Sequence, residues 1–245
     1  MISVCIATFN GEKYIKEQLE SLLFQLDKND EIIISDDNSS DNTISIINEF
    51  KDDRIKIFKG PEKGLISNFE NALTKSSGDY IFLCDQDDIW SDNKIQICVE
   101  DFKNGFDLVL SDCLIFSSNT KEILHTSFFK FNNSKKGIIN NLINNSYIGC
   151  CMAFKKELKC KILPFPKHIP MHDSWIGINA ELYFSVKFNT NKLINYRKHS
   201  ENVSDTSTGI SKYSFIKKVS FRVITVYYIF ERILFQKYNS KVYAK

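Results

Sequence analysis

The sequence predicts an α/β fold in which a mostly parallel sheet is covered by helices on both faces. Over the first hundred residues, short apolar runs alternate with segments whose apolar residues recur every three or four positions. Repeated strand–helix units of this kind build parallel sheets. The chain of 245 residues suits one large domain. Two acidic clusters also follow predicted strands, and such sheets bind ligands at the carboxyl ends of their strands.

The predicted elements follow one another in a regular order. In the first half, helices separate strands expected at residues 2–8, 31–36, 54–58, 79–85 and 106–116. A polar stretch at 119–145 is interpreted as a loop-rich insertion with one short helix. After it we expect a return to the sheet at 147–154, a helix at 173–184, a strand at 192–197 and a long helix at 213–238. The sequence thus indicates a main domain at 1–210 and a C-terminal basic, aromatic helix within 211–245.

Composition and charge indicate a folded protein without a general affinity for nucleic acids. The chain is 43% hydrophobic and 25% charged, which is ordinary for a globular domain, and its formal net charge is only +2. The charge is unevenly distributed, because residues 212–245 contain eight Lys/Arg and one Glu, a net of +7. The basic tail therefore points to a local partner.

Cysteine use and the N-terminus favour a cytoplasmic protein. No cleavable leader is apparent, since Met1 leads directly into the first predicted strand. The seven cysteines show no framework spacing, so buried, reduced thiols are expected. They are Cys5, Cys84, Cys98, Cys113, Cys150, Cys151 and Cys160.

The segment Asp85-Gln86-Asp87-Asp88 concentrates three carboxylates within four residues. Like charges at this spacing repel one another unless a cation or water screens them. Strand geometry would point Asp85 and Asp87 to the same side, which suits a hard divalent cation with oxygen ligands. A solvated acidic turn that caps the next helix is the alternative interpretation.

A second acidic segment begins with Asp36-Asp37 at the end of the second predicted strand. One interpretation is an Asx turn and helix N-cap. The other is a carboxylate that accepts a hydrogen bond from the imide N–H of a pyrimidine base. The sequence leaves both open at this point.

Several segments recur in one order along the chain. They are Thr8-Phe9-Asn10-Gly11-Glu12, Asp36-Asp37, Asp85–Asp88, Gly149–Met152, His172–Trp175, Tyr196–His199 and Asn202. Taken together, these segments resemble the inverting family-two glycosyltransferases with the GT-A fold. The resemblance is densest over residues 1–100, and within the family it is closest to bacterial rhamnosyltransferase-type members.

The resemblance implies a nucleotide-sugar site that depends on a metal, Mn²⁺ or Mg²⁺. It places Asp85 and Asp87 in a DxD motif that holds the metal and the donor diphosphate, with Asp87 as a direct ligand. It places the nucleotide against Thr8, Asn10, Asp36 and Asp37, with Asp37 reading a uracil or thymine base. It further implies that Asp88 touches the donor sugar, and that Arg197 and His199 lie in a loop over the diphosphate.

Asp173 occupies the position of the family's general base, according to the same resemblance. An unperturbed Asp has a pKa of about 3.9, so we expect this carboxyl to be ionised near neutrality. The alternative is a helix N-cap. Beside it, Trp175 and His172 are candidates for an acceptor or sugar platform, although Trp175 fits core packing equally well.

The C-terminal helix allows two interpretations. Its apolar stretch is far shorter than the roughly 20 residues that span a bilayer. A basic, aromatic helix can instead lie on an anionic membrane surface, here the inner face of the cytoplasmic membrane. Alternatively, the helix packs on the domain or on a second copy in a homodimer.

The resulting functional hypothesis is the inverting transfer of one sugar to a glycan or an undecaprenyl-diphosphate-linked acceptor in the synthesis of a bacterial surface polysaccharide. The donor is expected to be dTDP-rhamnose or, as the runner-up, a UDP-hexose. Processive relatives carry a Gln-x-x-Arg-Trp motif, which is absent from this sequence. The alternatives are a sugar-nucleotide nucleotidyltransferase and a catalytically inactive glycan-binding module.

Overall fold

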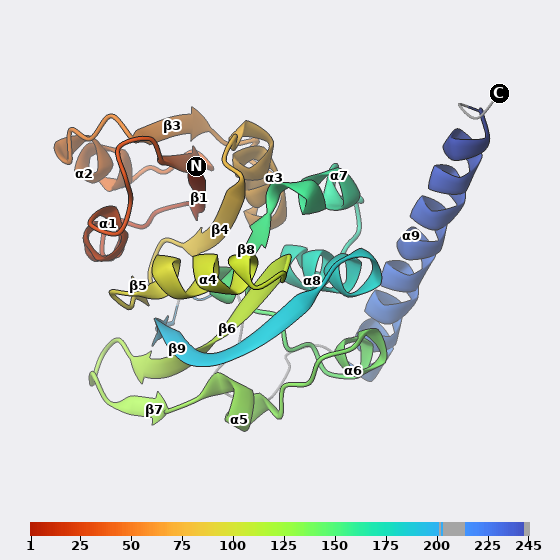
Figure 1. Ribbon diagram of the computed structural model, residues 1–245. Coiled ribbons are helices and arrows are strands. Elements are labelled where there is room, and N and C mark those ends of the chain that lie inside the picture. Colours follow the sequence, from red (N-terminus) through yellow and green to blue (C-terminus); the bar gives the residue numbers. More distant parts are fainter. Residues whose placement is uncertain (201, 203–213, 243–245) are drawn as a thin grey trace.

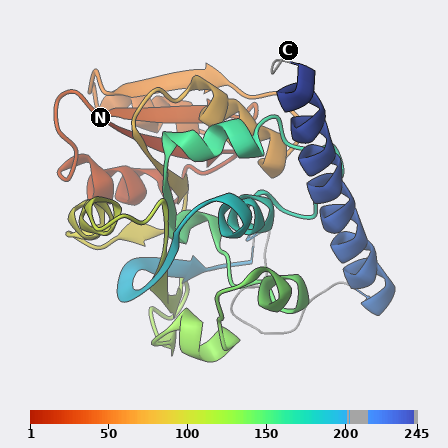
Figure 2. The same ribbon diagram turned by 45° about the vertical axis from the view of Figure 1, so that its right-hand side comes forward.

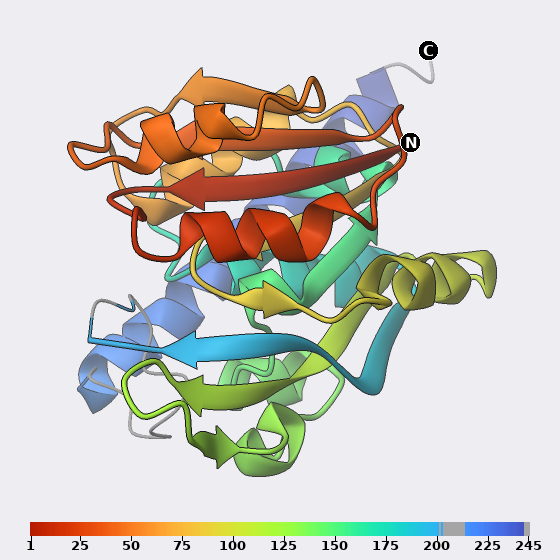
Figure 3. The ribbon, with the colours of Figure 1, turned by 90° about the vertical axis from the view of Figure 1, so that its left-hand side faces the viewer.

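The computed structural model describes residues 1–200, 202 and 214–242. Over these residues the strands form one nine-stranded sheet in the order β3-β2-β1-β4-β8-β6-β9-β5, with β7 paired to β6. The helices lie on both faces of this sheet. Helices α1, α2 and α4 face the viewer in Figure 3, whereas α3, α7 and α8 lie behind the sheet. The α/β prediction is therefore confirmed, although the sheet is mixed and not mostly parallel as expected.

The first half of the chain is a parallel βα array, as predicted. Strand β1 lies between β2 and β4, β2 pairs with β3, and all three pairings are parallel. The strands alternate with three helices: β1 (Ile2–Thr8), α1 (Ile15–Leu23), β2 (Glu31–Asp36), α2 (Thr43–Glu49), β3 (Ile55–Lys59), α3 (Leu65–Lys75) and β4 (Tyr80–Asp85). Strands β1 and β2 are buried along their whole length, which agrees with their largely apolar central residues.

The second half makes the sheet mixed. Strand β8 runs antiparallel to both β4 and β6, while β6 and β9 are parallel to each other. A two-residue strand, β5, pairs antiparallel with β9 where we expected the helix to begin at once. The elements are β5 (Ile89–Trp90), α4 (Lys94–Lys103), β6 (Leu108–Ser117), η1 (Gly149–Cys151), β8 (Met152–Lys155), η2 (Lys156–Leu158), α7 (Lys159–Ile162), α8 (His172–Tyr183) and β9 (Val186–Lys198).

The polar insertion contains more structure than the single short helix we expected. It comprises β7 (Ile123–His125), α5 (Phe128–Asn132) and α6 (Ile138–Ile143). Strand β7 extends the sheet beside β6. In Figure 1 these elements lie along the lower edge of the molecule, and α6 lies next to the long C-terminal helix.

Helix α9 (Phe215–Val242) lies along one side of the sheet domain (Figures 1 and 2). It corresponds to the helix predicted at 213–238. The predicted domain boundary at 210/211 lies outside the described residues. Among the residues that the structure describes, no helix combines the length and the apolar character that crossing a bilayer requires.

All seven cysteines are free thiols. Six of them are buried, and Cys160 is exposed. The buried thiols contribute small apolar volumes to the core rather than covalent cross-links.

The contact between Gly177 of α8 and the ring of Tyr147 gives a stability prediction. A Cβ on Gly177 would lie 2.3–2.4 Å from ring carbons of Tyr147. Gly→Ala inside a helix normally stabilises by roughly 1 kcal/mol. Here overpacking should instead lower the free energy of unfolding by about 1–3 kcal/mol, measured by urea denaturation. In a Tyr147→Ala background the same change should cost much less, and an equal cost in both backgrounds would contradict this packing.

Candidate active site

The strand register brings the two acidic segments to one edge of the sheet. Thr8, the last residue of β1, pairs with Asp36 at the end of β2. On the other side, Ala7 pairs with Asp85, the last residue of β4. The carboxyl ends of three adjacent parallel strands therefore form a common polar edge.

Asp36 and Asp37 have different surroundings. Asp36 is buried and accepts hydrogen bonds from the hydroxyl groups of Thr8 (2.9 Å) and Ser39 (2.6 Å). It also accepts one from the Ser39 N–H (2.9 Å), so it builds the turn after β2. Asp37 is half-buried and accepts one N–H on each oxygen, from Glu62 (2.6 Å) and Gly64 (2.8 Å). A carboxylate has about four lone-pair sites, so Asp37 retains acceptor capacity for a ligand.

The loop after β1 connects both acidic segments. Asn10 accepts the N–H of Ser40 (2.9 Å) and donates its own N–H to the Ser39 hydroxyl (2.9 Å). Phe9 exchanges two hydrogen bonds with the side chain of Gln86, both 3.0 Å long. A Cβ at Gly11 would lie 2.4 Å from the Gln86 side chain, so a larger residue there would displace the Gln86 amide.

Two residues of this polar edge received no role from the sequence. The side chain of Gln86 holds the β1 loop against the turn after β4. The ring of Phe9 is 55% exposed on this edge. The available signal in the sequence was an aromatic residue between Thr8 and Asn10 at the end of a predicted strand, because aromatic rings stack on nucleobases.

The carboxylates after β4 divide into two groups. Asp85, Asp88 and the Cys150 thiol form a candidate metal site, with ligand atoms within 4.8 Å of one another. Strand alternation had predicted Asp85 and Asp87 on the same side. Strand β4 ends at Asp85, so the alternation does not continue through the turn, and Asp87 points to a different partner.

The raised pKa values of this cluster show that no nearby positive charge in the described part of the chain balances its carboxylates. Burial, together with the charge of Asp87, raises the pKa of Asp85 to about 8 and that of Asp88 well above its usual range. Asp88 accepts the Arg197 N–H (2.8 Å), but its second oxygen is buried without a partner among the described residues. A divalent cation would relieve this repulsion, so the residues fit the metal that the resemblance implies.

Asp87 contacts the end of β9. Its carboxylate lies 2.7 Å from Nε2 of His199 and 3.4 Å from the amide nitrogen of Asn202. Its backbone carbonyl accepts a hydrogen bond from Nε of Arg197 (2.7 Å). The Asp87 carboxylate is thus engaged by His199, and a cation that uses this carboxylate would replace that contact.

Arg197 is buried beneath this contact. Its guanidinium group pairs with Glu17 and lies 5.1 Å from the ring of Tyr14 and 5.0 Å from the ring of Phe116. Through these contacts Arg197 links β9 to α1 and to the turn after β4. Its charge is therefore engaged by the protein, whereas we had expected it to face the diphosphate.

Asp173 lies in the first turn of α8, whose N-cap is Met171. The N-cap interpretation of Asp173 is therefore wrong. Its carboxyl accepts backbone N–H groups of Ser174 and Gly149, which lower its pKa. Desolvation outweighs them and raises the pKa to about 7, so our expectation of full ionisation near neutrality is corrected. The Asp173 charge also raises the pKa of Asp85, which places the two carboxyls in one electrostatic site.

His172 and Trp175 are core residues. His172 is 3% exposed and stacks on Phe69 with ring centroids 4.2 Å apart. Burial lowers its pKa to about 3, so it is neutral. Trp175 is fully buried, and its indole N–H donates to the carbonyl of Ile162 (3.0 Å). Neither ring is available to a sugar, so the structure corrects the platform hypothesis in favour of packing.

Comparison with known proteins identifies the family. The profile described as "Glycosyl transferase family 2" matches residues 3–161. A relative from Escherichia coli, UDP-Glc:alpha-D-GlcNAc-diphosphoundecaprenol beta-1,3-glucosyltransferase WfgD, is 30% identical over 182 residues, which are 73% of this chain and 69% of that protein. The dTDP-rhamnosyl transferase RfbG of Shigella flexneri is 40% identical over 123 residues, 46% of this chain and 40% of that protein. The chain belongs to glycosyltransferase family 2 and is a glycosyltransferase.

Solved structures confirm the GT-A fold. The crystal structure of Staphylococcus aureus TarS 1–349 in complex with UDP-GlcNAc has a TM-score of 0.70 at 19% identity, over 92% of this chain and 66% of that chain. The mannosyltransferase PcManGT of Pyrobaculum calidifontis, in complex with GDP-Man and Mn²⁺, has a TM-score of 0.62 at 16% identity, over 82% and 58%. This chain thus spans less than two thirds of both structures and a larger part of the Escherichia coli relative.

The raised pKa of Asp173 predicts how stability depends on pH. The folded protein retains this proton up to about pH 7, whereas the unfolded chain releases it near its usual value. Between these values the folded state binds more protons, so the contribution of Asp173 to the free energy of unfolding falls as pH rises. Asp173→Asn removes that contribution. Its Tm relative to wild type should therefore increase between about pH 5 and about pH 8.

Differential scanning calorimetry in EDTA measures this difference without a metal. Asp92→Asn, a change at a carboxyl outside the cluster, serves as the matched control. An Asp173→Asn difference in Tm that does not vary with pH would contradict the raised pKa.

Proposed function

We propose that this chain transfers a single sugar, with inversion, from a pyrimidine nucleotide diphosphate sugar to a lipid-linked glycan acceptor. One observation carries the proposal: the polar edge of β1 and β2 lies beside the crowded carboxylates after β4, and the Asp173 carboxyl belongs to the same electrostatic site. The proposed nucleotide pocket, cation site and base are thereby adjacent. These are the three parts that the resemblance implies.

The donor proposed first is dTDP-rhamnose, and a UDP-hexose is the runner-up. The names of the two relatives support one donor each, dTDP-rhamnose for the Shigella protein and UDP-Glc for the Escherichia coli protein. Both donors carry a pyrimidine base with an imide N–H. The free acceptor capacity of Asp37 suits that N–H, and the exposed ring of Phe9 offers a surface for stacking.

The proposed metal is Mn²⁺ or Mg²⁺, with Asp87 and Asp85 as its ligands. To bind it, the Asp87 carboxylate would exchange its contact with His199 for the cation. Asp88 lies close enough to Asp85 to offer a further oxygen ligand. When bound, the cation neutralises the charge that develops on the departing diphosphate. Arg197 and Gln86 hold the turn that carries the carboxylates, through the carbonyl of Asp87 and the backbone of Phe9.

Asp173 is proposed as the general base. As the acceptor oxygen bonds to the anomeric carbon, its proton passes to the Asp173 carboxylate. The bond from the anomeric carbon to the phosphate oxygen breaks, and the nucleoside diphosphate leaves with the electron pair. This single displacement inverts the anomeric configuration and needs no covalent intermediate. A base with a pKa near the working pH suits the step.

The acceptor proposed is a glycan on undecaprenyl diphosphate, and the product a bacterial surface polysaccharide. The name of the Escherichia coli relative includes a diphosphoundecaprenol acceptor. Such an acceptor lies in a membrane, so contact of α9 with that membrane is part of the proposal. A donor-hydrolysis screen over dTDP- and UDP-sugars, with and without Mn²⁺, tests the donor. Absence of hydrolysis with every donor would favour an inactive glycan-binding module.

The roles of Asp87 and Asp173 predict different defects. Asp173→Asn should reduce transfer about 10²–10⁴-fold, because it cannot accept a proton, and should leave donor affinity almost unchanged. Asp87→Asn should reduce both transfer and Mn²⁺-dependent donor binding. Isothermal titration with donor and a transfer assay separate the two defects. Wild-type turnover in Asp173→Asn would exclude it as the base, and full wild-type activity in EDTA would exclude the metal.

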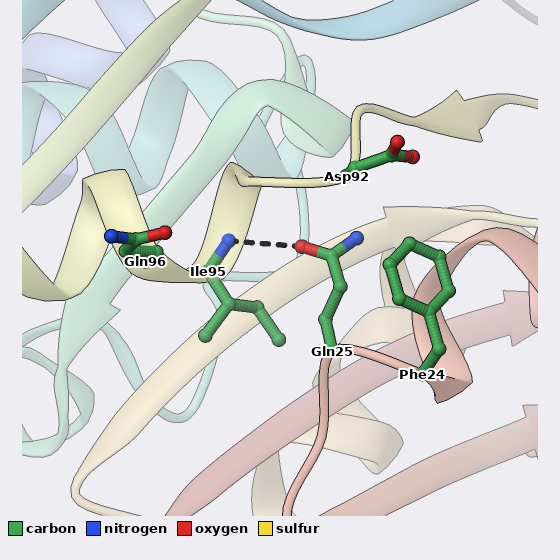
Figure 4. Close-up of a pocket in the computed structure, with 5 residues that line it drawn as sticks. All are labelled: Phe24, Gln25, Asp92, Ile95 and Gln96. Carbon is green, nitrogen blue, oxygen red and sulfur yellow. Dashed lines mark hydrogen bonds between the residues drawn. The ribbon is translucent and has the colours of Figure 1, made fainter.

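The exposed ring of Phe9 predicts a contribution to nucleotide affinity. Stacking on an aromatic ring contributes about 1–3 kcal/mol per base, so Phe9→Ala should weaken UDP or dTDP binding by roughly 5–150-fold. Phe24 is similarly exposed, at the C-terminal end of α1, and lines a separate pocket with Gln25, Asp92, Ile95 and Gln96 (Figure 4). Phe24→Ala is therefore the matched control, with unchanged affinity. Equal affinities of the two variants would exclude stacking on Phe9.

A further inference from the structure

Helix α9 turns an apolar stripe away from the domain. At about 100° per residue, the six side chains of this stripe fall within about 80° of the helix circumference. Each is exposed, with Ile216 at 80% and Leu234 at 66%. The stripe consists of Ile216, Val219, Val223, Tyr227, Phe230 and Leu234.

Arginine contacts hold much of the opposite side of α9 on the domain. Arg222 donates to the carbonyls of Leu142 (2.6 Å) and Ile143 (2.8 Å), the last residues of α6. Arg232 donates to carbonyls of the chain around α7 and lies 4.9 Å from the ring of Trp175. Among the described side chains of α9, only Thr225 and Ile229 are buried. The inward side is apolar too, because Ile229 is buried and Tyr228 and Ile233 pack against the core. The outward stripe is therefore a second apolar side that packing on the domain does not use.

Helix α6 extends the apolar surface. Its residues Ile139 and Ile143 are 74% and 66% exposed. Helix α6 lies beside the first turns of α9 in Figures 1 and 2, and the bonds of Arg222 join the two helices directly. Lysines border this surface, because Lys135 and Lys136 precede α6 and Lys217 lies in the first turns of α9, all three exposed.

We propose that the α6–α9 face, made of the α9 stripe with Ile139 and Ile143, docks on an anionic lipid bilayer. The apolar side chains enter the boundary between head groups and acyl chains, and the bordering lysines contact anionic head groups. This proposal rests on the proposed function, because a lipid-linked acceptor needs an enzyme at the bilayer surface. It extends the contact from α9 alone to a composite surface that includes the polar insertion.

Charge favours a lipid surface over a second copy of the chain. Residues 212–245 carry a net charge of +7, from eight Lys/Arg and one Glu. A symmetric dimer through α9 would bring two such segments together, and like charges repel. An anionic bilayer attracts the same segment, most strongly at low ionic strength. The α6–α9 face thus combines apolar exposure with a charge that only an anionic partner complements.

Vesicle flotation with the full chain tests the proposal. Wild type should float with vesicles of phosphatidylcholine and phosphatidylglycerol at low salt, and less at high salt or with phosphatidylcholine alone. Val223→Asp/Tyr227→Asp should reduce binding at least about tenfold, and Ile139→Asp/Ile143→Asp should reduce it by a similar factor. Phe24→Asp is the control for the chemical change, because it places an aspartate at a similarly exposed ring at the C-terminal end of α1 and should bind like wild type.

Each outcome decides the proposal. Wild type that ignores anionic vesicles at low salt overturns it. A dimer in sedimentation equilibrium that Val223→Asp/Tyr227→Asp dissociates assigns the face to a second copy. Normal binding by Ile139→Asp/Ile143→Asp removes α6 from the surface. Circular dichroism and donor hydrolysis of each variant check the fold and the active site. Flotation needs neither donor nor acceptor, so failure of transfer leaves this result interpretable.

Discussion

The repulsion among the carboxylates after β4 is the constraint on which the rest of the site depends. Three carboxylates within four residues cannot all remain charged at a half-buried sheet edge. The protein counters this in two ways. The backbone N–H of Arg197 contacts Asp88, and the ring of His199 contacts Asp87. The pKa of Asp85 is still raised to about 8. The negative charge of the cluster is therefore not fully balanced by the protein, and a bound cation would balance it.

Long-range pairing supplies these contacts. Strand β9 runs parallel to β6 over ten residue pairs and antiparallel to β5, so its end arrives at the turn after β4. More than one hundred residues of sequence separate Asp87 from His199. The local sequence around Asp85–Asp88 therefore explains the repulsion but contains no sign of how the fold balances it.

This separation also explains what the sequence could predict. The parallel half of the sheet follows from local periodicity, and its strand ends place Thr8, Asp36 and Asp85 correctly. The antiparallel strands β5 and β8 depend on distant partners, so their directions could not be predicted. Trp175 shows the same limit at a single residue. The sequence pattern of an apolar helix is the same whether its aromatic ring packs in the core or faces a ligand. The ring is fully buried, with its N–H bonded to the carbonyl of Ile162 and Arg232 stacked over it, so Trp175 is a core residue.

Asp173 shows why a site that costs stability can persist. Backbone N–H groups of Ser174, Gly149 and Asp173 itself favour its ionised form, yet desolvation dominates and its pKa rises to about 7. A carboxylate in water, with a pKa near 3.9, is a weak proton acceptor at neutral pH. The burial that makes this carboxyl costly to ionise also makes it a stronger base. The packing of α8 against Tyr147 and Phe69 therefore couples the stability of the fold to the basicity of one side chain, and a change that solvates Asp173 would gain stability and lose basicity together.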